Sequence, residues 1–581
     1  MIFKRNHITI VITLLFTSFT FAQETNRTKD TINTEVVNVV KPYTPKISDA
    51  FKVKEIPSLE DEVTENRKEV KYNIFSIPVA STFTPAKGKA ADVDKAEPVK
   101  LYDNYASFGV GSYTSFLGEV YLNHAINRSE SVGGYVSHHS SAGGIDGVLL
   151  EDDFSETKFN ANYSRKLGDY SWNVDLGAKH QVFNWYGLPE GLYDSTLIES
   201  IDPQHTYFTF DFGGEIKFDN RLLNDGRMRF RRFADDFESG ENRFTFSTNI
   251  DIPLSDGELN TTFKFDYLGG TFDESYFGTE KIEYGNFQVG VIPSYQILED
   301  DLTVNLGVSA FYMNDTEAGK NKFYIFPKVT ASYRLVDEVL ITYGGIEGDL
   351  IQNSYYDFAR QNPFMSPTLF IMPTDQQYDA YIGLKGKLSN NMSYNIRGNY
   401  KAENNKALIK NNTERNYSSG NSYNRGNSFG AVYDDVNTFS LFGELNVNVN
   451  RNFTLGIKAE YFTYTTEIEE KAWNQPDFEA SLFMDIQFDK HWYAGANLFY
   501  VGERFDQASF EGSLIPGEDL TMTAALESYF DANAHLGYRI NDQWSVYAKA
   551  NNIANQDYKR WMNYPVQGLQ FLAGTTYKFD F

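Results

Sequence analysis

The protein has 581 residues and no Cys, and its 78 Asp and Glu outnumber its 52 Lys and Arg, which gives a formal net charge of −26 at pH 7. A chain this acidic repels phosphate backbones, so nucleic acid is not an expected partner. The lack of Cys excludes disulfide scaffolds, Cys-type zinc sites and Cys nucleophiles.

The first 22 residues have the features of a secretory signal peptide. Lys4 and Arg5 precede an apolar run over residues 8–21, and Ala22 offers a small residue for cleavage. The run is shorter than the roughly 20 residues that a membrane-spanning helix needs. No other stretch reaches that length. If the exported chain enters a membrane, it must therefore do so as a closed barrel.

Residues 23–103 differ in composition from the rest of the chain. They are rich in Lys, Glu, Asp and Thr and show little periodicity. They also contain six prolines: Pro42, Pro45, Pro57, Pro78, Pro85 and Pro98. We expect an extended segment, periplasmic or luminal, rather than a packed domain.

From residue 104 to residue 581, polar and apolar residues alternate as in strands with one apolar face. The alternation is clearest in residues 439–450, 453–461, 478–489 and 544–551. Within residues 478–489, Phe483 is the one apolar residue on the polar face. A soluble sandwich would alternate too, but its strands usually run about five or six residues. The longer runs predict an all-β fold, a transmembrane antiparallel barrel with a charged inner face.

Short polar turns recur along this region and give the strand number. They lie at residues 127–130, 167–169, 220–226, 255–257, 299–301, 336–338, 389–391, 450–452, 489–491 and 541–543. Ten turns at one end of the barrel, with both chain ends at that end, predict 22 strands. The other end then carries the long loops.

The C-terminal region resembles that of TonB-dependent receptors, especially those of Bacteroidetes. The similarity rests on Trp544-Ser-Val-Tyr-Ala-Lys-Ala-Asn-Asn-Ile-Ala-Asn-Gln-Asp-Tyr558, on Tyr564-Pro-Val-Gln-Gly568 and on the final Thr-Thr-Tyr-Lys-Phe-Asp-Phe581. Asn362-Pro363 and Asn242-Arg243-Phe244 look similar as well. The resemblance covers residues 104–581 and implies a receptor of the cell outer membrane that takes up a solute with energy delivered by TonB.

The last strand ends in aromatic residues on one face. By the resemblance, Tyr577, Phe579 and Phe581 form the signal that the barrel-assembly machinery reads in outer-membrane proteins. The alternative is a stripe that only contacts outer-membrane lipid, and both can hold for the same residues.

The sequence departs from the family at its N-terminal end, where family members carry a globular plug inside the barrel. Residues 23–103 show no such pattern, so a full plug is not expected. A barrel of 22 strands needs a filled lumen, which this segment, a partner protein acting as lid or plug, or inward-folded loops could provide. The run Glu35-Val36-Val37-Asn38-Val39-Val40 resembles the short box that recruits TonB by strand addition. An ordinary strand is the alternative.

Catalytic and metal sites are not indicated. His138 and His139 are adjacent on a strand, so they point to opposite faces and cannot chelate together. Asp235, Asp236 and Glu238 could bind Ca²⁺, but they lack the spacing of a dedicated loop. The sequence also lacks a nucleophile elbow and a phosphate-binding loop, and the glycines of Gly109-Val-Gly111 fit a strand. We expect neither an enzyme nor a cofactor.

Arg227, Arg229 and Arg231 are spaced by two, so they share one face of a strand. We predict a basic ladder in the lumen. It could attract an anionic solute, or it could pair with luminal acids such as Glu479 and Asp485 or with the N-terminal segment.

Four outer loops are the expected ligand surface, because binding residues concentrate in loops on a rigid scaffold. They are residues 184–204, 353–375, 403–436 and 503–527. The predicted ligand-binding residues are Trp185, Tyr186, Tyr355, Tyr356, Phe358, Arg360 and Phe364. Their rings could stack on a ligand, or they could pack loop against loop.

These features favour an outer-membrane transport protein whose loops capture a solute and pass it through the barrel. One alternative is a plugless barrel that serves as a structural or accessory subunit of an outer-membrane assembly. Another is a passive porin.

Overall fold

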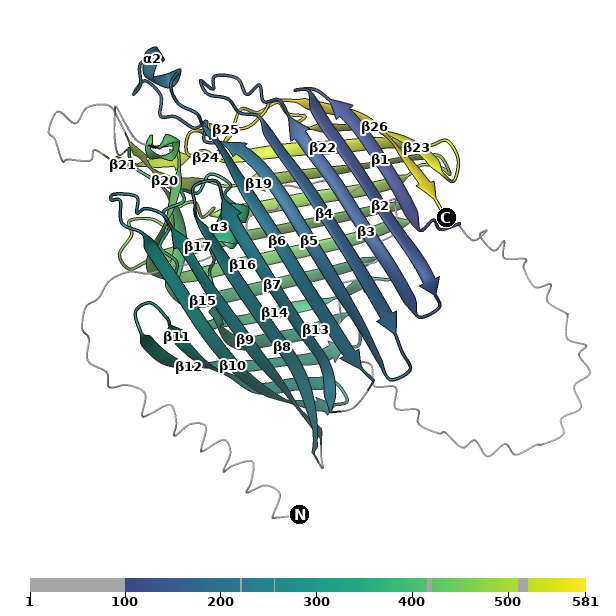
Figure 1. Ribbon diagram of the computed structural model, residues 1–581. Helices are drawn as coiled ribbons and strands as arrows, with labels where there is room; N and C mark the ends of the chain where they lie inside the picture. Colours follow the sequence, from purple (N-terminus) through teal and green to yellow (C-terminus); the bar gives the residue numbers. More distant parts are fainter. Residues whose placement is uncertain (1–99, 220–221, 255–256, 415–420, 451, 510–520) are drawn as a thin grey trace, which may run out of the picture.

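The computed structural model describes residues 100–219, 222–254, 257–414, 421–450, 452–509 and 521–581, and the chain forms a closed antiparallel barrel of 22 strands (Figure 1). The predicted fold class and strand number are confirmed. The signal peptide, residues 23–99 and the TonB-box-like run Glu35–Val40 lie outside the described residues.

The barrel strands follow one another in chain order around the ring, each paired with the next. They are β1 (Asn104–Gly111), β2 (Ser115–Asn127), β3 (Glu130–Ser141), β4 (Phe154–Lys166), β5 (Tyr170–Asn184), β6 (Gln204–Phe218), β7 (Leu223–Asp235), β8 (Gly240–Leu254), β9 (Gly257–Phe272), β10 (Ile282–Glu299), β11 (Leu302–Asp315), β12 (Lys320–Val336), β13 (Leu340–Ile351), β14 (Thr374–Ser389), β15 (Met392–Asn411), β16 (Phe429–Asn450), β17 (Phe453–Thr466), β18 (Phe478–Gln487), β19 (Trp492–Val501), β22 (Tyr529–Arg539), β23 (Trp544–Asn551) and β26 (Gln570–Phe579).

The remaining elements lie in the loops. They are α2 (Ser195–Ile198), α3 (Tyr355–Gln361), the 3₁₀ turn η1 (Ser422–Asn424), the pair β20 (Arg504–Ser509) and β21 (Thr521–Leu526), and the short pair β24 (Lys559–Trp561) and β25 (Tyr564–Pro565). None of the helices in the described ranges is long and apolar enough to cross a membrane.

The strand connections differ in length between the two ends of the barrel. The ten predicted turns all fall between strands at one end, which we call the turn end, and the N-terminal start of β1 and the C-terminus lie there too (Figure 1). The opposite end, the loop end, carries the long connections. Two predicted loops differ from expectation. β15 runs to Asn411 and β16 begins at Phe429, so half of residues 403–436 is strand, and residues 503–527 include the strands β20 and β21.

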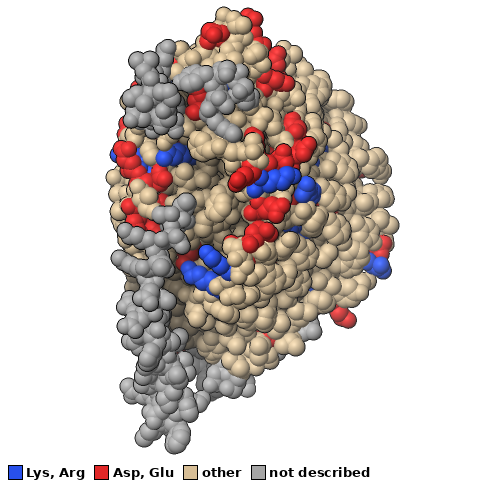
Figure 2. All heavy atoms as spheres, turned by 60° about the vertical axis from the view of Figure 1, so that its left-hand side comes forward, with Lys and Arg blue, Asp and Glu red and all other residues tan. Residues whose placement is uncertain are grey.

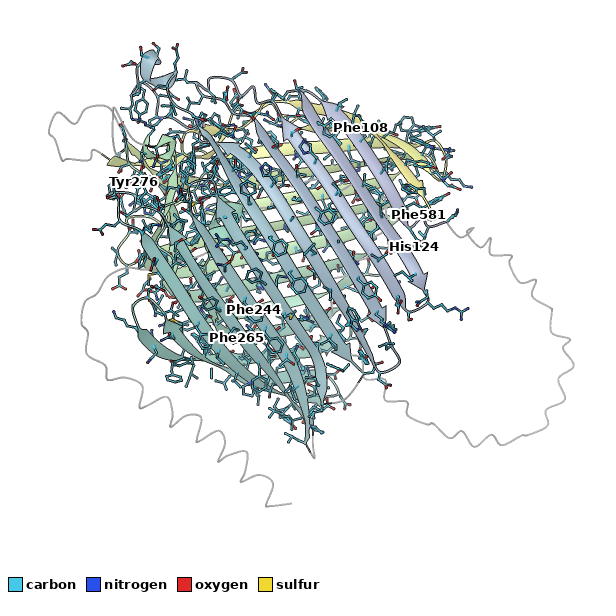
Figure 3. The ribbon with its side chains drawn as sticks, in the orientation of Figure 1. Phe108, His124, Phe244, Phe265, Tyr276 and Phe581 are labelled. Carbon is cyan, nitrogen blue, oxygen red and sulfur yellow. The ribbon has the colours of Figure 1, made fainter. Side chains whose placement is uncertain are left out.

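The two faces of the wall have opposite character, as the alternation predicts. Phe108 and Phe244 are exposed on the outside, and Phe244 lies edge to face with Phe265 at 5.8 Å between ring centroids (Figure 3). Charged side chains are sparse over the lower part of the wall visible in Figure 2. Phe483 faces inward. Its ring lies over Gly456 on the neighbouring strand and occupies the space that a larger side chain there would take.

The barrel closes where β1 pairs with β26, with Gly109 opposite Gly574 and Gly111 opposite Leu572. Gly111 allows a close approach of the two backbones: a Cβ built there would lie 2.2 Å from the carbonyl oxygen of Phe571. The same carbonyl accepts a hydrogen bond from the Ser112 amide at 2.8 Å. A side chain at position 111 would therefore push the closing strands apart.

We expect Gly111→Val to destabilise the folded barrel by about 1–3 kcal/mol, the usual cost of overpacking. Gly443→Val is the matched control, because a Cβ at Gly443 meets no atom within 4 Å. The measurement is the temperature at which the compact barrel band is lost on a denaturing gel. Equal temperatures for the two variants would contradict the closure geometry.

Candidate functional site

The loop between β13 and β14, residues 352–373, folds across the barrel at the loop end; we call it the mouth loop. Ser354 caps α3 through its hydroxyl, which accepts a hydrogen bond from the Asp357 amide at 3.1 Å. The Asn353 amide group donates to the Met372 carbonyl at 2.8 Å and to Thr374 Oγ1 at 2.9 Å, which ties the two ends of the loop together. Hydrogen bonds within the mouth loop and between its ends thus hold its conformation.

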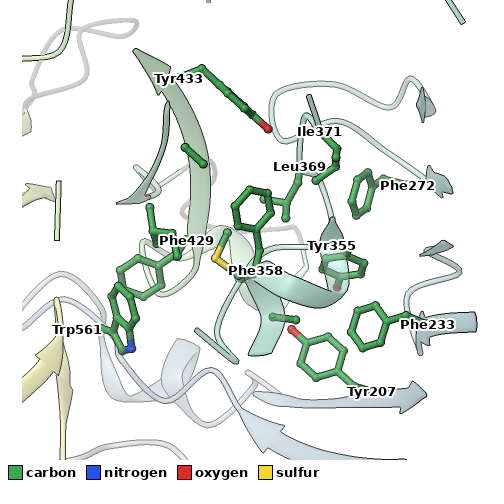
Figure 4. Packing of buried hydrophobic residues seen from close by; sticks show 14 of the residues in the cluster. Tyr207, Phe233, Phe272, Tyr355, Phe358, Leu369, Ile371, Phe429, Tyr433 and Trp561 are labelled. Atoms are coloured by element: carbon green, nitrogen blue, oxygen red, sulfur yellow. The ribbon is translucent and has the colours of Figure 1, made fainter. Parts of the chain in front are cut away.

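The mouth loop packs into a buried cluster that we call the mouth core (Figure 4). Its residues come from inward-facing positions of the wall, from the mouth loop, from β21 and from the loop after β23. They are Tyr207, Phe233, Leu268, Phe272, Tyr284, Tyr355, Phe358, Ala359, Met365, Leu369, Ile371, Ala407, Ile409, Phe429, Tyr433, Leu526, Trp561, Met562 and Tyr564.

The mouth core reaches across the barrel. Tyr207 lies on β6 and Tyr433 on β16, and these strands are ten places apart in a ring of 22. On one side, the Tyr355 ring lies edge to face with Phe233 at 4.9 Å and with Phe272 at 5.0 Å. On the other side, Phe364 stacks on Tyr564 at 3.8 Å. The mouth loop therefore bridges nearly opposite walls.

A buried carboxylate holds the start of α3. Glu241, on β8, is 1% exposed and accepts hydrogen bonds from the backbone amides of Tyr355 at 2.7 Å and Tyr356 at 3.1 Å. It also accepts one from the Tyr284 hydroxyl at 2.9 Å. Burial of a carboxylate is tolerated only with such partners, so Glu241 and the helix start depend on each other. No local pattern in the sequence points to Glu241, because Tyr355 and Tyr356 lie over a hundred residues away along the chain.

Further polar contacts fix the mouth loop to β7 and β8. The Tyr355 hydroxyl donates to Asp235 Oδ2 at 2.8 Å, and burial raises the pKa of this hydroxyl, which keeps it protonated as a donor. Arg243 pairs with Asp357 of α3 at 3.2 Å and with Asp266 at 2.7 Å.

The Pro363 carbonyl accepts two further hydrogen bonds, from His205 at 2.7 Å and from the Tyr207 hydroxyl at 2.9 Å. The Asn362-Pro363 element is therefore a contact point between the mouth loop and β6.

The predicted ligand-binding residues all lie in this loop-end assembly, but few of them are accessible. Trp185, Tyr355 and Phe358 are at most 3% exposed, and Trp185 stacks on His205 at 4.0 Å. Tyr186 and Phe364 are partly buried against the mouth core. Tyr356 is half-buried and Arg360 is exposed. Loop-against-loop packing thus accounts for most of these rings, and ligand contact stays a prediction.

The arginine ladder faces inward and pairs with acids on the neighbouring strands. Arg227 contacts Glu215 at 2.7 Å, Arg229 contacts Asp175 at 3.1 Å and Arg231 contacts Asp211 at 3.1 Å. These partners lie on β5 and β6 rather than at Glu479 and Asp485 of β18. Neutralised in this way, the ladder offers little net attraction for an anionic solute.

The ladder ends beneath the mouth loop. The Arg231 guanidinium lies 3.8 Å from the centroid of the Tyr356 ring, and Arg360 and Lys179 lie 5.7 and 6.0 Å from it. Cations over an aromatic face are attracted to its negative potential. Tyr356 therefore connects the polar inner wall to the mouth loop.

The acidic patch and the paired histidines have structural contacts. Asp235 accepts hydrogen bonds from the amides of Phe237 and Ser239, and Asp236 accepts one from the amide of Thr206. His138 contacts Thr157 at 2.8 Å, whereas His139 packs on Phe154. Within the described ranges, no group of three or more His, Asp or Glu residues is placed to hold a metal ion.

The predicted assembly residues form a continuous outward stripe. The ring centroids of Tyr577 and Phe579 lie 5.6 Å apart, and those of Phe579 and Phe581 lie 5.5 Å apart. Trp544 adds a ring 4.6 Å from Tyr577. Recognition by the assembly machinery stays a prediction.

The loop end is strongly acidic. Its described loops contain twenty-four Asp and Glu and seven Lys and Arg. The acids concentrate in residues 142–153, 185–203, 273–281 and 467–477. Acidic side chains also gather in the upper part of Figure 2, on the side of the loop end.

The hairpin of β20 and β21 is anchored by a buried acid. Asp506 is 0% exposed and accepts hydrogen bonds from the Asn411 amide and from Asn474 Nδ2, both at 2.8 Å. Burial raises the pKa of Asp506 to about 6 from the ordinary value of 3.8. The folded hairpin therefore favours the protonated acid.

Since its pKa is higher in the folded state, Asp506 stabilises the hairpin below about pH 4, and this contribution is lost as the pH rises through about 6. We expect slower proteolytic cleavage in residues 467–477 and 504–507 at pH 5 than at pH 7.5, with a protease active at both values. Asp506→Asn should remove the difference, and the exposed-loop variant Asp557→Asn should retain it. A pH effect that persists in Asp506→Asn would contradict this assignment.

No family model and no curated protein matches the sequence. Similar folds occur in solved structures. The ferric-catecholate import receptor Fiu from E. coli K12 has a TM-score of 0.59 and 13% identity, over 82% of this chain and 82% of that chain. The FrpB iron transporter from Neisseria meningitidis has a TM-score of 0.62 and 10% identity, over 83% and 82%. The siderophore receptor PirA from Acinetobacter baumannii has a TM-score of 0.60 and 11% identity, over 82% and 80%.

At these identities the similarity concerns the fold. It agrees with the resemblance to TonB-dependent receptors that the C-terminal motifs indicate. The chain has the outer-membrane barrel fold of iron and siderophore receptors.

Proposed function

We propose that this protein is an outer-membrane receptor that captures a solute at its loop end and passes it through the barrel with energy delivered by TonB. The observation that carries the proposal is the closed 22-stranded barrel whose long, structured loops all stand at one end. Receptors for iron chelates share this fold. The packed loops provide a rigid platform on which the exposed Arg360 and the half-buried Tyr356 can contact a ligand.

The charge of the loop end favours a neutral or cationic solute. Acidic loops raise the local concentration of cations and repel anions before contact is made. The arginine ladder does not offset this field, because each of its members is paired with an acid. A polyanionic iron chelate is therefore a poor match for this receptor.

The charge argument predicts which chelate the receptor binds. We expect the purified protein to bind a cationic ferric hydroxamate chelate faster than an anionic ferric catecholate chelate. Its association rate with the cationic chelate should fall as salt is added, because salt screens the acidic loops. Surface plasmon resonance at low and high ionic strength measures both rates. Preferential binding of the catecholate would contradict the argument.

Coupling to TonB is tested at the Val-rich run near the N-terminus. Deletion of residues 34–40 should abolish uptake of a bound solute and leave surface binding unchanged, because the run recruits TonB from the periplasmic side by strand addition. Radiolabelled iron accumulation in cells measures uptake, and membrane fractionation confirms that the variant reaches the outer membrane. Undiminished uptake by a correctly located variant would count against energised transport.

The mouth core favours the accessory-subunit alternative and disfavours the passive porin. A barrel crossed by a packed core suits a structural or accessory subunit, to which a partner protein could dock. A passive porin would need an open lumen, and a core of buried aromatic residues at the mouth opposes that. Loss of solute binding together with loss of an outer-membrane assembly on deletion of the gene would support the accessory role.

A further inference from the structure

A barrel of 22 strands has an interior too wide for its wall side chains to fill, and the mouth core spans it at the loop end. Its members are buried to 9% exposure or less, although they stand at the end of a lumen whose lower wall is accessible. Below the core, inward side chains such as Arg227 and Phe483 are more than 40% exposed. Among the described residues, the packing that spans the barrel therefore lies at the loop end.

The mouth loop contacts the wall on several sides. It leaves the ring between β13 and β14, binds β6 through Pro363 and β8 through Glu241, and reaches Tyr564 in the loop after β23. On the far side it joins β16 by a two-residue bridge: the Ser366 amide donates to the Phe429 carbonyl at 2.8 Å, and the Phe429 amide donates to the Phe364 carbonyl at 3.1 Å.

Glu241 anchors the start of α3 in the mouth loop. It is the one carboxylate among the described contacts that accepts two consecutive backbone amides of the mouth loop, and it does so in a buried position. Removing an acceptor there leaves buried donors without partners, which is costly. The loop should then leave the wall more often.

We propose that the mouth loop is a resident stopper that closes the barrel without help from the N-terminal segment, and that Glu241 is the positioning residue that holds it in place. The stopper acts whatever solute the receptor takes up, so the proposal does not depend on the proposed uptake.

The first experiment is conductance in planar bilayers of the purified mature protein and of a version lacking residues 23–99. Both should stay closed. Steady conductance of the shortened version beside a closed full-length protein would overturn the proposal, because the N-terminal segment would then be the barrier.

The second experiment weakens the stopper. Glu241→Gln should raise the fraction of time spent open roughly tenfold to hundredfold, since it removes a charged acceptor from buried amides. Glu283→Gln is the control, because Glu283 is exposed and stands beside Tyr284 without contacting the mouth loop. Equal closure of both variants would overturn the role of Glu241.

A third variant keeps the test decisive if Glu241→Gln does not fold. Met365 and Phe429 are bridge partners, which brings their Cα atoms into disulfide range, and the chain has no other Cys. Both forms lack two buried side chains, but only the oxidised form has a covalent link between the mouth loop and β16. Met365→Cys with Phe429→Cys should therefore stay closed when oxidised and conduct when reduced. Met365→Cys alone should not respond to the oxidation state. Closure of the double variant in both states would overturn the proposal.

Discussion

Backbone amides and carbonyls in a hydrocarbon layer have no water to bind, so each must find a partner within the protein. The wall meets this constraint by closing on itself, and the pairing of β1 with β26 leaves no free edge. Closure requires tight contact at the seam, which Gly111 permits. The closed wall has 22 strands. The interior of such a barrel is too wide for wall side chains alone to fill.

The interior differs between the lower wall and the loop end in the partners that its polar side chains find. Along the lower wall, charges pair between neighbouring strands, as Arg227 does with Glu215, and the lumen stays polar. At the loop end the inward positions become aromatic, and the mouth loop supplies the matching apolar surface. Specific partners satisfy the buried amides of Tyr355 and Tyr356 and the buried Tyr355 hydroxyl, and these partners are Glu241 and Asp235. The packed mouth loop thus provides a rigid surface at the loop end and, as we propose, closes the barrel there.

Much of the wall could be predicted from the sequence, because strand alternation and turn residues are local signals. The turns at 167–169 and 389–391, the inward face of the arginines and the strand number all follow from them. Residues 403–411 and 429–436 are strand rather than the predicted loop. Both faces of these segments are packed at the loop end, so the alternation disappears; Leu408 and Val436 are both at most 1% exposed. The ladder pairs with acids of β5 and β6, and the mouth core joins residues from many strands and loops. The periodicity within one strand does not reveal contacts between different strands.

The central claim is that the mouth loop is a packed part of the barrel rather than a free surface loop. Hydrogen exchange of the mature protein in lipid nanodiscs tests it most directly, at the amides of Tyr355 and Tyr356 that donate to Glu241. The account predicts protection close to that of the barrel strands, in full-length protein and in protein lacking residues 23–99 alike. Exchange at the rate of an unstructured loop would contradict it.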